Sequence, residues 1–197
     1  AIRRLVEIQV LCNDSRLEKD DNEGSWRIMG DPTEGAMVVV GAKAGMDREA
    51  MNKKQPRLQE IPFDSKRKLM TTFHKNEEGQ LLAYTKGAPD ILVSQCTRIM
   101  RRDGSIEAIT PADVEEILAQ NKALASQALR VLAMAFKPIN EVPAHPTPEA
   151  DEVELVFTGL VGMIDRPRVE AIEAIKVCKK AGIRVVMITG DYKDTAA

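Results

Sequence analysis

The chain has 197 residues, of which 44% are hydrophobic and 29% charged, and its formal net charge is −2. These values are typical of a soluble globular protein and exclude a disordered chain. The small net charge gives no general attraction to nucleic acid or to an anionic membrane, so we expect neither as a direct partner. The uncharged run over residues 155–164 is about half the roughly 20 apolar residues of a membrane helix, and no N-terminal segment suggests a signal peptide.

The cysteines and histidines give no metal-binding pattern. Cys12, Cys96 and Cys178 lie far apart and form no Cys-x-x-Cys pair, which predicts buried thiols in a reducing compartment. His74 and His145 each lack a second ligand at metal-site spacing. The sequence therefore predicts no metal site in this chain.

The N-terminal segment predicts a helix, a turn-rich stretch and a short strand. Apolar residues recur three apart over residues 2–11, which is the spacing of an amphipathic helix. Residues 13–24 are polar and rich in turn formers, and residues 26–29 indicate a strand.

The segment Gly-Asp-Pro-Thr-Glu at residues 30–34 carries a clear helix start. Asp31 can cap the first turn, Pro32 suits that turn, and Glu34 completes a capping box. From local sequence alone, this cap is the favoured role of Glu34. We expect the helix over residues 36–45, with a charged continuation to residue 54.

The pattern becomes strand-like between residues 58 and 86. Two alternating segments flank an Asn-Glu-Glu-Gly turn at residues 76–79, which predicts a β-hairpin. Counting back from that turn places Lys68 opposite about Gly87. Lys68 and Lys86 are therefore expected to lie together at the open end of the hairpin, near Phe63.

This open end has the chemistry of a nucleotide site. Like charges across a strand pair are unfavourable unless an anion lies between them, and Gly87 permits close approach to the backbone. Pro89 opens a short helix whose free N–H groups favour negative charge. Phe63 could stack on a base while Lys68 and Lys86 bind phosphates. The alternative is a solvated strand end with its lysines in water, which this geometry alone slightly favours.

The remaining elements change in order near residue 165. We predict helices over 90–96, 112–129 and 169–181, a hairpin across 101–104, strands over 131–136, 155–164 and 183–188, and a proline-rich loop over 137–154. Antiparallel hairpins thus give way to strand–helix–strand, and the last strand is of the buried parallel type. We place a domain boundary at about Asp165.

Two further positions are weak candidates by themselves. Arg130 lies where a predicted helix passes into a strand, and there it could offset the helix dipole. The tripeptide at residues 189–191 follows the last predicted strand, and ligands in open α/β sheets bind at the carboxyl ends of strands.

Six motifs occur in a characteristic order along the chain. They are Gly30-Asp31-Pro32-Thr33-Glu34, Pro62-Phe63 with Lys66-Arg67-Lys68, Lys86-Gly87-Ala88-Pro89, Leu129-Arg130-Val131-Leu132-Ala133, Asp165-x-Pro167-Arg168 and Thr189-Gly190-Asp191. In this order and spacing, the chain closely resembles the P-type cation-transporting ATPases, in particular the branch that contains the calcium pumps. The resemblance covers essentially the whole chain.

The resemblance implies an α+β fold in two parts. Residues 1–164 would form a nucleotide-binding domain, an antiparallel sheet flanked by helices. Residues 165–197 would form the hinge and the first, Rossmann-like α/β portion of the phosphorylation domain. Without the sheet that it normally joins, this second part is expected to be loosely ordered or covered by a neighbouring chain.

The resemblance also implies residues that contact the base. Phe63 matches the aromatic on which adenine stacks, Glu34 the acid that reaches the adenine amino group, and Leu132 an apolar cover for the base.

Other matched positions concern the phosphates. Lys68 and Lys86 match lysines of the nucleotide cavity, Gly87 the close-approach glycine, and Arg130 a residue near the phosphates.

In a whole pump, the C-terminal motifs would act on the transferring phosphoryl group. Thr189, Gly190 and Asp191 match a phosphate site, and Asp165, Pro167 and Arg168 match the hinge.

Some positions depart from the family pattern. Arg166 replaces a proline of the hinge, Asp90 stands where Glu is common, and Ser65 stands where some relatives carry arginine. The Asp-Lys-Thr-Gly-Thr segment with the phosphorylated aspartate and the later magnesium-holding segment are not in this sequence. The chain thus resembles an excised piece of a pump, with no catalytic residue of its own.

We therefore expect a chain that binds ATP or ADP without hydrolysing it. In the full-length protein, Mg²⁺ would be a cofactor, and the remaining phosphorylation, actuator and membrane domains would be partners. The chain would then be a cytoplasmic domain of an integral membrane protein. Calcium is the expected ion, with manganese and sodium as alternatives. The competing hypotheses are a haloacid-dehalogenase-type phosphatase fragment and a non-enzymatic interaction domain that docks an acidic partner.

Overall fold

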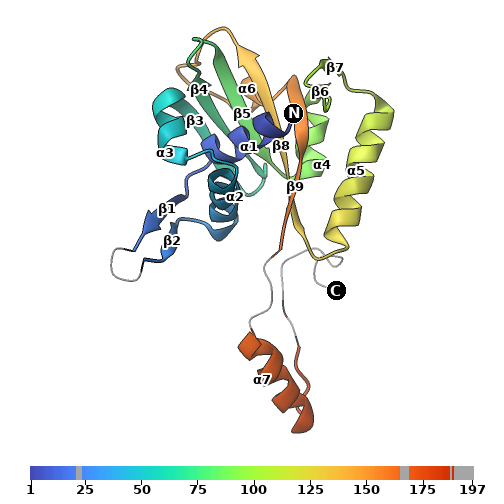
Figure 1. The fold of residues 1–197 in the computed structure, drawn as a ribbon. Helices are drawn as coiled ribbons and strands as arrows, with labels where there is room; N and C mark the ends of the chain where they lie inside the picture. Colours follow the sequence, from blue (N-terminus) through green and yellow to red (C-terminus); the bar gives the residue numbers. More distant parts are fainter. Residues whose placement is uncertain (21–23, 165–168, 187, 189–197) are drawn as a thin grey trace.

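A large mixed sheet forms the centre of the chain (Figure 1). The computed structural model describes residues 1–20, 24–164, 169–186 and 188. The seven-stranded sheet has the order β3-β4-β5-β8-β9-β6-β7, and among its described pairings only β6 with β9 is parallel. Its strands are β3 (Arg57–Asp64), β4 (Leu69–Lys75), β5 (Leu81–Gly87), β6 (Cys96–Met100), β7 (Ile106–Ala108), β8 (Arg130–Ile139) and β9 (Leu155–Met163). The predicted α+β class is confirmed.

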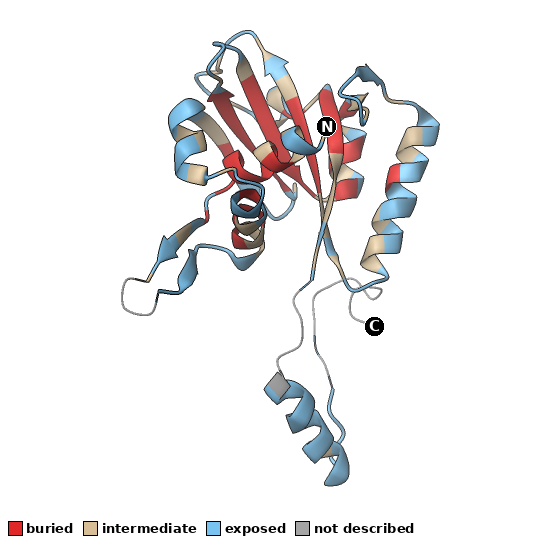
Figure 2. Cartoon of the chain, viewed as in Figure 1, coloured by how far each residue is buried: buried red, intermediate tan, exposed pale blue. Residues whose placement is uncertain are grey.

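Helices cover both faces of this sheet. On one face lie α1 (Ile2–Leu11), α2 (Pro32–Lys43) and α3 (Arg48–Lys54), and on the other lie α4 (Pro89–Ser94) and α5 (Pro111–Ala125). Buried residues are concentrated in the strands and on the inner sides of the helices (Figure 2). The arrangement follows from strands whose residues are apolar on both faces.

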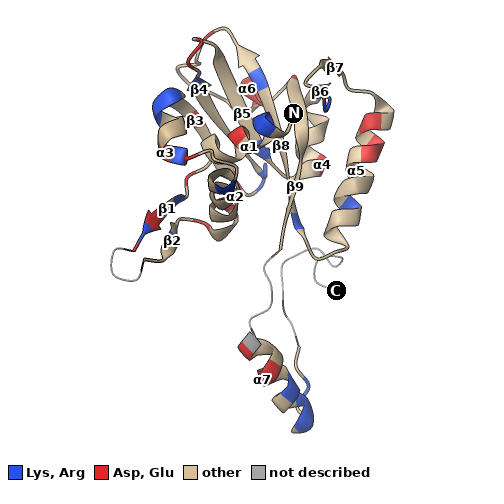
Figure 3. Cartoon of the chain, viewed as in Figure 1, with Lys and Arg blue, Asp and Glu red and all other residues tan. Residues whose placement is uncertain are grey.

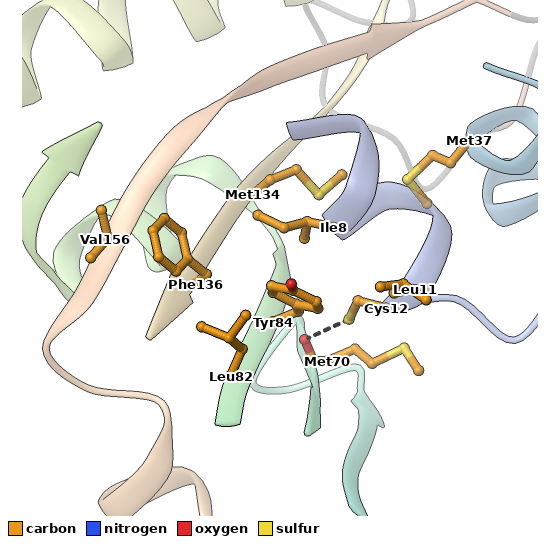
Figure 4. Close-up of a cluster of buried hydrophobic side chains, with 10 residues drawn as sticks. All are labelled: Ile8, Leu11, Cys12, Met37, Met70, Leu82, Tyr84, Met134, Phe136 and Val156. Carbon is orange, nitrogen blue, oxygen red and sulfur yellow. Dashed lines mark hydrogen bonds between the residues drawn. The ribbon is translucent and has the colours of Figure 1, made fainter. Parts of the chain in front are cut away.

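Alternate residues of β8 contribute to two separate cores, one on each face of the sheet. Met134 and Phe136 of β8 pack with Ile8 of α1 (Figure 4), whereas Ala133 and Ala135 face α4 and α5. This division follows from the two-residue period of a strand, which sends neighbouring side chains to opposite faces.

The predicted β4–β5 hairpin is confirmed, with one difference in register. His74 pairs with Leu82 around the turn, where Gly79 has a positive φ of 82°. At the open end, Leu69 rather than Lys68 pairs with Gly87. Lys68 belongs to the preceding turn, with a left-handed φ of 57°, and counting from the far turn could not foresee this.

The N-terminal region contains more breaks than its sequence pattern indicates. The helix expected over residues 36–54 is two helices, because Gly45 has φ 73° and Asp47 caps α3 through the amide of Ala50 at 2.8 Å. The segment expected to be only turn-rich contains β1 (Arg16–Lys19), which pairs with β2 (Trp26–Met29).

Other boundaries also differ from the predictions: α4 ends at Ser94, before Cys96 of β6, and β8 continues to Ile139. Helix α5 ends at Ala125, four residues before the predicted end, and Ala128 then has φ 58°. The proline-rich loop contains a single helical turn, α6 (Pro148–Asp151), which begins with proline at its first position.

The C-terminal segment differs most from its prediction. Helix α7 (Val169–Lys180) is followed by Gly182 with φ 74°, as expected, and its ends carry opposite charges that complement the helix dipole (Figure 3). The buried parallel strand predicted over 183–188 is wrong: its described residues form no strand, and they are exposed, from 46% for Val185 to 94% for Ile188. None of the described strands pairs with this run, so its backbone and apolar side chains gain nothing from an extended sheet conformation.

Two of the three thiols are buried as predicted. Cys12 and Cys96 are free and buried, and burial raises the pKa of Cys96 to about 12. The Cys12 thiol donates a hydrogen bond to the carbonyl oxygen of Met70, drawn in Figure 4. Cys178 on α7 is partly exposed.

Candidate functional site

One cavity of about 890 Å³ lies between α2, α5, β8 and the open end of the β4–β5 hairpin. Seven residues singled out from the sequence line it together: Glu34, Phe63, Lys68, Lys86, Gly87, Arg130 and Leu132. They come from parts of the chain separated by up to about a hundred positions. The fold therefore brings all seven of these residues to one place.

A buried ion pair lies in the cavity wall. Lys86 of β5 is only 6% exposed, and its Nζ donates a hydrogen bond to Oε1 of Glu34 on α2. Burial of a lone ammonium group would be costly, so the carboxylate is what allows the lysine to lie here. The Glu34 carboxylate therefore offsets the repulsion between the two lysines at the open end of the hairpin.

Glu34 does not act in the predicted capping box. Asp31 caps α2 as predicted, accepting from the amides of Thr33 at 2.8 Å and Glu34 at 3.2 Å. The Oε2 of Glu34 accepts from the amides of Asp14 at 2.9 Å and Ser15 at 3.1 Å. These donors come from the loop after α1, so only tertiary packing could reveal them.

Buried Asn13 holds this loop against α2. Its Nδ2 donates to the carbonyl oxygens of Gln9 and Glu34, both at 2.9 Å. The backbone amides at positions 14 and 15 are thereby aimed at the Glu34 carboxylate.

Gly87 has a structural role that the sequence did not indicate. A Cβ at this position would lie 2.1 Å from the carbonyl oxygen of Lys68 and 2.6 Å from the Leu69 side chain. The same carbonyl accepts from the amide of Ala88 at 3.1 Å. The close approach at Gly87 is therefore made by the protein's own turn, which sets the position of Lys68 at the cavity.

Phe63 differs from the other phenylalanines of the chain. Phe73, Phe136 and Phe157 are buried, whereas Phe63 at the end of β3 is 61% exposed and lines the cavity. An exposed aromatic ring does not contribute the free energy that burial of its surface would provide, unless a ligand covers it. Leu132 of β8 lines the same cavity and is half-buried.

Arg130 links two walls of the cavity. It is exposed at the start of β8, and its Nη1 donates to the hydroxyl of Thr33 on α2 at 3.0 Å. Its guanidinium group therefore lies beside the capped N-terminus of α2.

Sequence reasoning missed several lining residues. Met37 and Met70 provide apolar surface, and Asn121 and Lys122 add polar groups from α5. The sequence offered no pattern to find the α5 residues, because helix periodicity alone does not say which neighbour a polar face will meet.

The C-terminal motifs cannot be placed at this cavity. The hinge residues Asp165, Pro167 and Arg168 and the tripeptide Thr189, Gly190 and Asp191 lie outside the described residues. Among the described residues, no group of three or more His, Cys, Asp or Glu could hold a metal ion. No helix in the described ranges is both long and apolar enough to cross a membrane.

These features define an α+β domain with a cavity lined by apolar residues and by equal numbers of acidic and basic residues. Comparison with known proteins gives its family: the model for the P-type ATPase cytoplasmic domain N matches residues 1–170. The chain belongs to this family.

Its relatives are long proteins, and the chain matches one part of each. It is 45% identical over 194 residues to calcium-transporting ATPase 1 of Bacillus cereus, covering 98% of this chain and 21% of the relative. It is 41% identical over 195 residues to the calcium-transporting ATPase of Bacillus subtilis, covering 99% and 22%. A sodium/potassium exporting P-type ATPase of Schizosaccharomyces pombe is 37% identical over 194 residues, covering 98% and 18%. The chain thus spans about a fifth of the length of these relatives.

Proposed function

We propose that the chain binds ATP or ADP in the cavity between α2, α5 and the β4–β5 hairpin. The observation that carries this proposal is the exposed ring of Phe63 in one cavity with Lys68, Lys86 and Arg130. A nucleotide has an aromatic base and anionic phosphates, which match these two kinds of side chain. Membership of the P-type ATPase N domain family supports the same ligand.

The base is expected at Phe63, with Leu132 as an apolar cover. For Glu34 to accept a hydrogen bond from the adenine amino group, one of its lone pairs must be available. A carboxylate has about four acceptor positions. The two backbone amides and the Ser15 hydroxyl all contact Oε2, whereas Lys86 donates to Oε1. The second acceptor position of Oε1 is therefore the one that the adenine amino group would use.

The phosphates are expected toward Lys68 and Arg130, which are both exposed at the rim. One stacking face and two or three exposed charges supply only about 4–6 kcal/mol, which corresponds to a dissociation constant on the order of millimolar to tens of micromolar. The chain contains no nucleophilic aspartate motif, so we expect it to bind nucleotide without hydrolysing it.

In a longer protein, this domain would deliver ATP to an aspartate that lies outside the chain. The phosphoenzyme would drive cation transport, with calcium as the proposed ion because the relatives named above include calcium-transporting ATPases. The chain would be a cytoplasmic domain of a membrane pump, with the pump's other domains as partners. Mg²⁺ would enter with ATP or be held elsewhere, since the described residues form no metal-ligand group.

A titration followed by NMR or calorimetry tests the proposal. ATP should shift the Gly87 amide resonance, and Phe63→Ala should weaken ATP binding by about tenfold, which corresponds to about 1.4 kcal/mol. Trp26→Ala is the matched control, because Trp26 is also exposed, at 65%, but does not line the cavity. Absence of any ATP-induced shift at Gly87 would overturn the proposal.

Two ligands distinguish the competing functions. Inorganic triphosphate should bind more weakly than ATP, because it lacks a base for Phe63. Equal binding of both would favour a basic docking surface for an acidic partner. Efficient turnover of a simple phosphate ester would favour the phosphatase hypothesis.

A further inference from the structure

The turn between β3 and β4 carries two of the proposed nucleotide contacts. Phe63 lies just before this turn and Lys68 ends it. Within the turn, Oδ1 of Asp64 accepts from the amides of Lys66 and Arg67, both at 2.9 Å, and the carbonyl oxygen of Asp64 accepts from the amide of Lys68 at 2.6 Å. These bonds shape the turn but do not connect it to the rest of the domain.

Arg67 adds a side-chain connection to the backbone contact that the Lys68 carbonyl makes with the Ala88 amide. Its Nη1 donates to both carboxylate oxygens of Glu152, at 2.5 and 2.6 Å, and its Nη2 donates to the carbonyl oxygen of Pro62 at 2.6 Å. One guanidinium group therefore joins the residue before Phe63, the turn itself and the segment after α6. The contacts to Glu152 and Pro62 come from two different nitrogens of one planar guanidinium group, whereas lysine has a single charged nitrogen.

Glu152 is itself held from the sheet. Its side chain is 3% exposed, and its Oε1 accepts from the hydroxyl of Thr71 on β4 at 2.6 Å. The Thr71 hydroxyl lies 2.9 Å from that of Thr85, its register partner on β5. The chain of contacts thus runs from the middle of the β4–β5 hairpin, through Glu152 and Arg67, to the turn at the cavity.

A contribution to the stability of the fold does not by itself explain why Arg67 and Glu152 form a buried ion pair. Taking two charges out of water costs free energy that a buried ion pair often fails to recover. Burial raises the pKa of the Glu152 carboxyl, against the opposing effects of Thr71 and Arg67, which is consistent with such a cost. A buried ion pair does, however, impose a single geometry on the groups that it joins.

We propose that Arg67 and Glu152 are positioning residues of the nucleotide site. Their ion pair holds the turn so that Phe63 and Lys68 are in place before the ligand arrives. Neither residue of the pair lines the cavity, so both act through Phe63 and Lys68. This inference rests on the proposed nucleotide binding. A preformed site binds more tightly because less ordering is required on association.

The test compares the parent chain with Arg67→Lys and Glu152→Gln in titrations with ATP and with adenosine. Because the turn carries both a base contact and a phosphate contact, Glu152→Gln should weaken binding of both ligands by about five- to tenfold. Arg67→Lys keeps the charge but cannot reach Glu152 and Pro62 together, so it should still weaken both by about threefold. Lys68→Ala, by contrast, should weaken ATP and leave adenosine nearly unchanged.

A control separates positioning from general stability. Asp113→Asn breaks the ion pair with Arg101 and the cap of α5, at the end of the helix remote from the cavity residues 121 and 122. It should lower resistance to urea while leaving both affinities within about twofold of the parent. If Glu152→Gln does not fold, Arg67→Lys decides, because its expected loss of about threefold for both ligands exceeds the roughly twofold limit of the control.

The outcomes distinguish the two proposals. If the parent binds ATP and the Arg67 and Glu152 variants bind both ligands as tightly as the parent, the positioning role is wrong and the proposed function stands. A second contradicting outcome is that the variants lose no more affinity than Asp113→Asn loses when stability falls by the same amount. In that case too, the positioning role is wrong. If the parent itself does not bind ATP, both proposals fail.

Discussion

Strand β8 and the run over residues 183–188 have similar sequences and opposite surroundings. Both are short, largely aliphatic segments that follow a helix. In β8, the central residues are buried because β5 and β9 pair with both edges and helices cover both faces. The described residues of the second run pair with no described strand and are exposed. An apolar pattern thus indicates that a segment favours burial, and the neighbouring strands determine whether it is buried.

The largest expected difference concerns side-chain truncation in the two regions. Ile8→Ala removes a fully buried side chain from the core drawn in Figure 4 and should lower the free energy of unfolding by about 3–4 kcal/mol. Val186→Ala should change it by less than about 0.5 kcal/mol, because Val186 is exposed. Urea unfolding measures both. A large cost for Val186→Ala would show that the C-terminal run is packed in solution.

The second prediction uses the two histidines of the 1–164 region. Burial lowers the pKa of His74 from 6.5 to about 4, whereas His145 is exposed. Because the unfolded chain binds the proton more readily, stability should be complete above pH 6.5 and fall as the pH decreases toward 4. The loss is up to about 3 kcal/mol.

Urea unfolding across this pH range gives the measurement. His74→Gln should flatten the profile between pH 6.5 and 4, and His145→Gln should leave it unchanged. A parent profile without any decrease in that window would mean that the interior around His74 admits a charged imidazole.

Nucleotide should stabilise one region only. At ten times its dissociation constant, ATP should add about 1.4 kcal/mol to the stability of the domain that binds it. Hydrogen exchange should then slow at the Lys68 and Gly87 amides and remain fast at Val185 and Val186. Slower exchange at all four amides would indicate that the C-terminal run is coupled to the cavity.

The smallest expected effect is that of a surface ion pair on α7. Lys176 and Glu173 are 2.8 Å apart with side chains 60% and 64% exposed. Lys176→Gln should change stability by about 0.5 kcal/mol or less, since exposed pairs are screened and costly in side-chain entropy. Thermal unfolding at low and high salt checks this. A clear salt-dependent loss would mean that α7 carries more of the stability than its exposure indicates.

Local patterns predicted much of the fold. The hairpin turn at residues 76–79, the cap of α2 by Asp31 and the first helix all depend on contacts within about one turn of chain. The predicted helix boundaries and strand register were wrong where one residue changed the direction of the backbone, as at Gly45 and Lys68. Such left-handed positions are hard to infer because they depend on the elements that meet on either side.

The site was predicted as a set of positions but not as a set of contacts. The motifs identified seven residues that share one cavity. They did not reveal that Lys86 is paired with Glu34, or that Gly87 accommodates the carbonyl of Lys68. Lys122 and Asn121 were missed because α5 carries no pattern that marks its cavity side.

By itself, the sequence determined the helix and hairpin starts, the α+β class and the family resemblance, because these depend on short motifs and on their order. Only the tertiary structure decided which charges are buried together. Lys86 and Glu34 lie 52 positions apart, and Arg67 and Glu152 lie 85 apart. Such pairs exist only when sheet, helix and loop have packed, since water screens the same charges in the open chain.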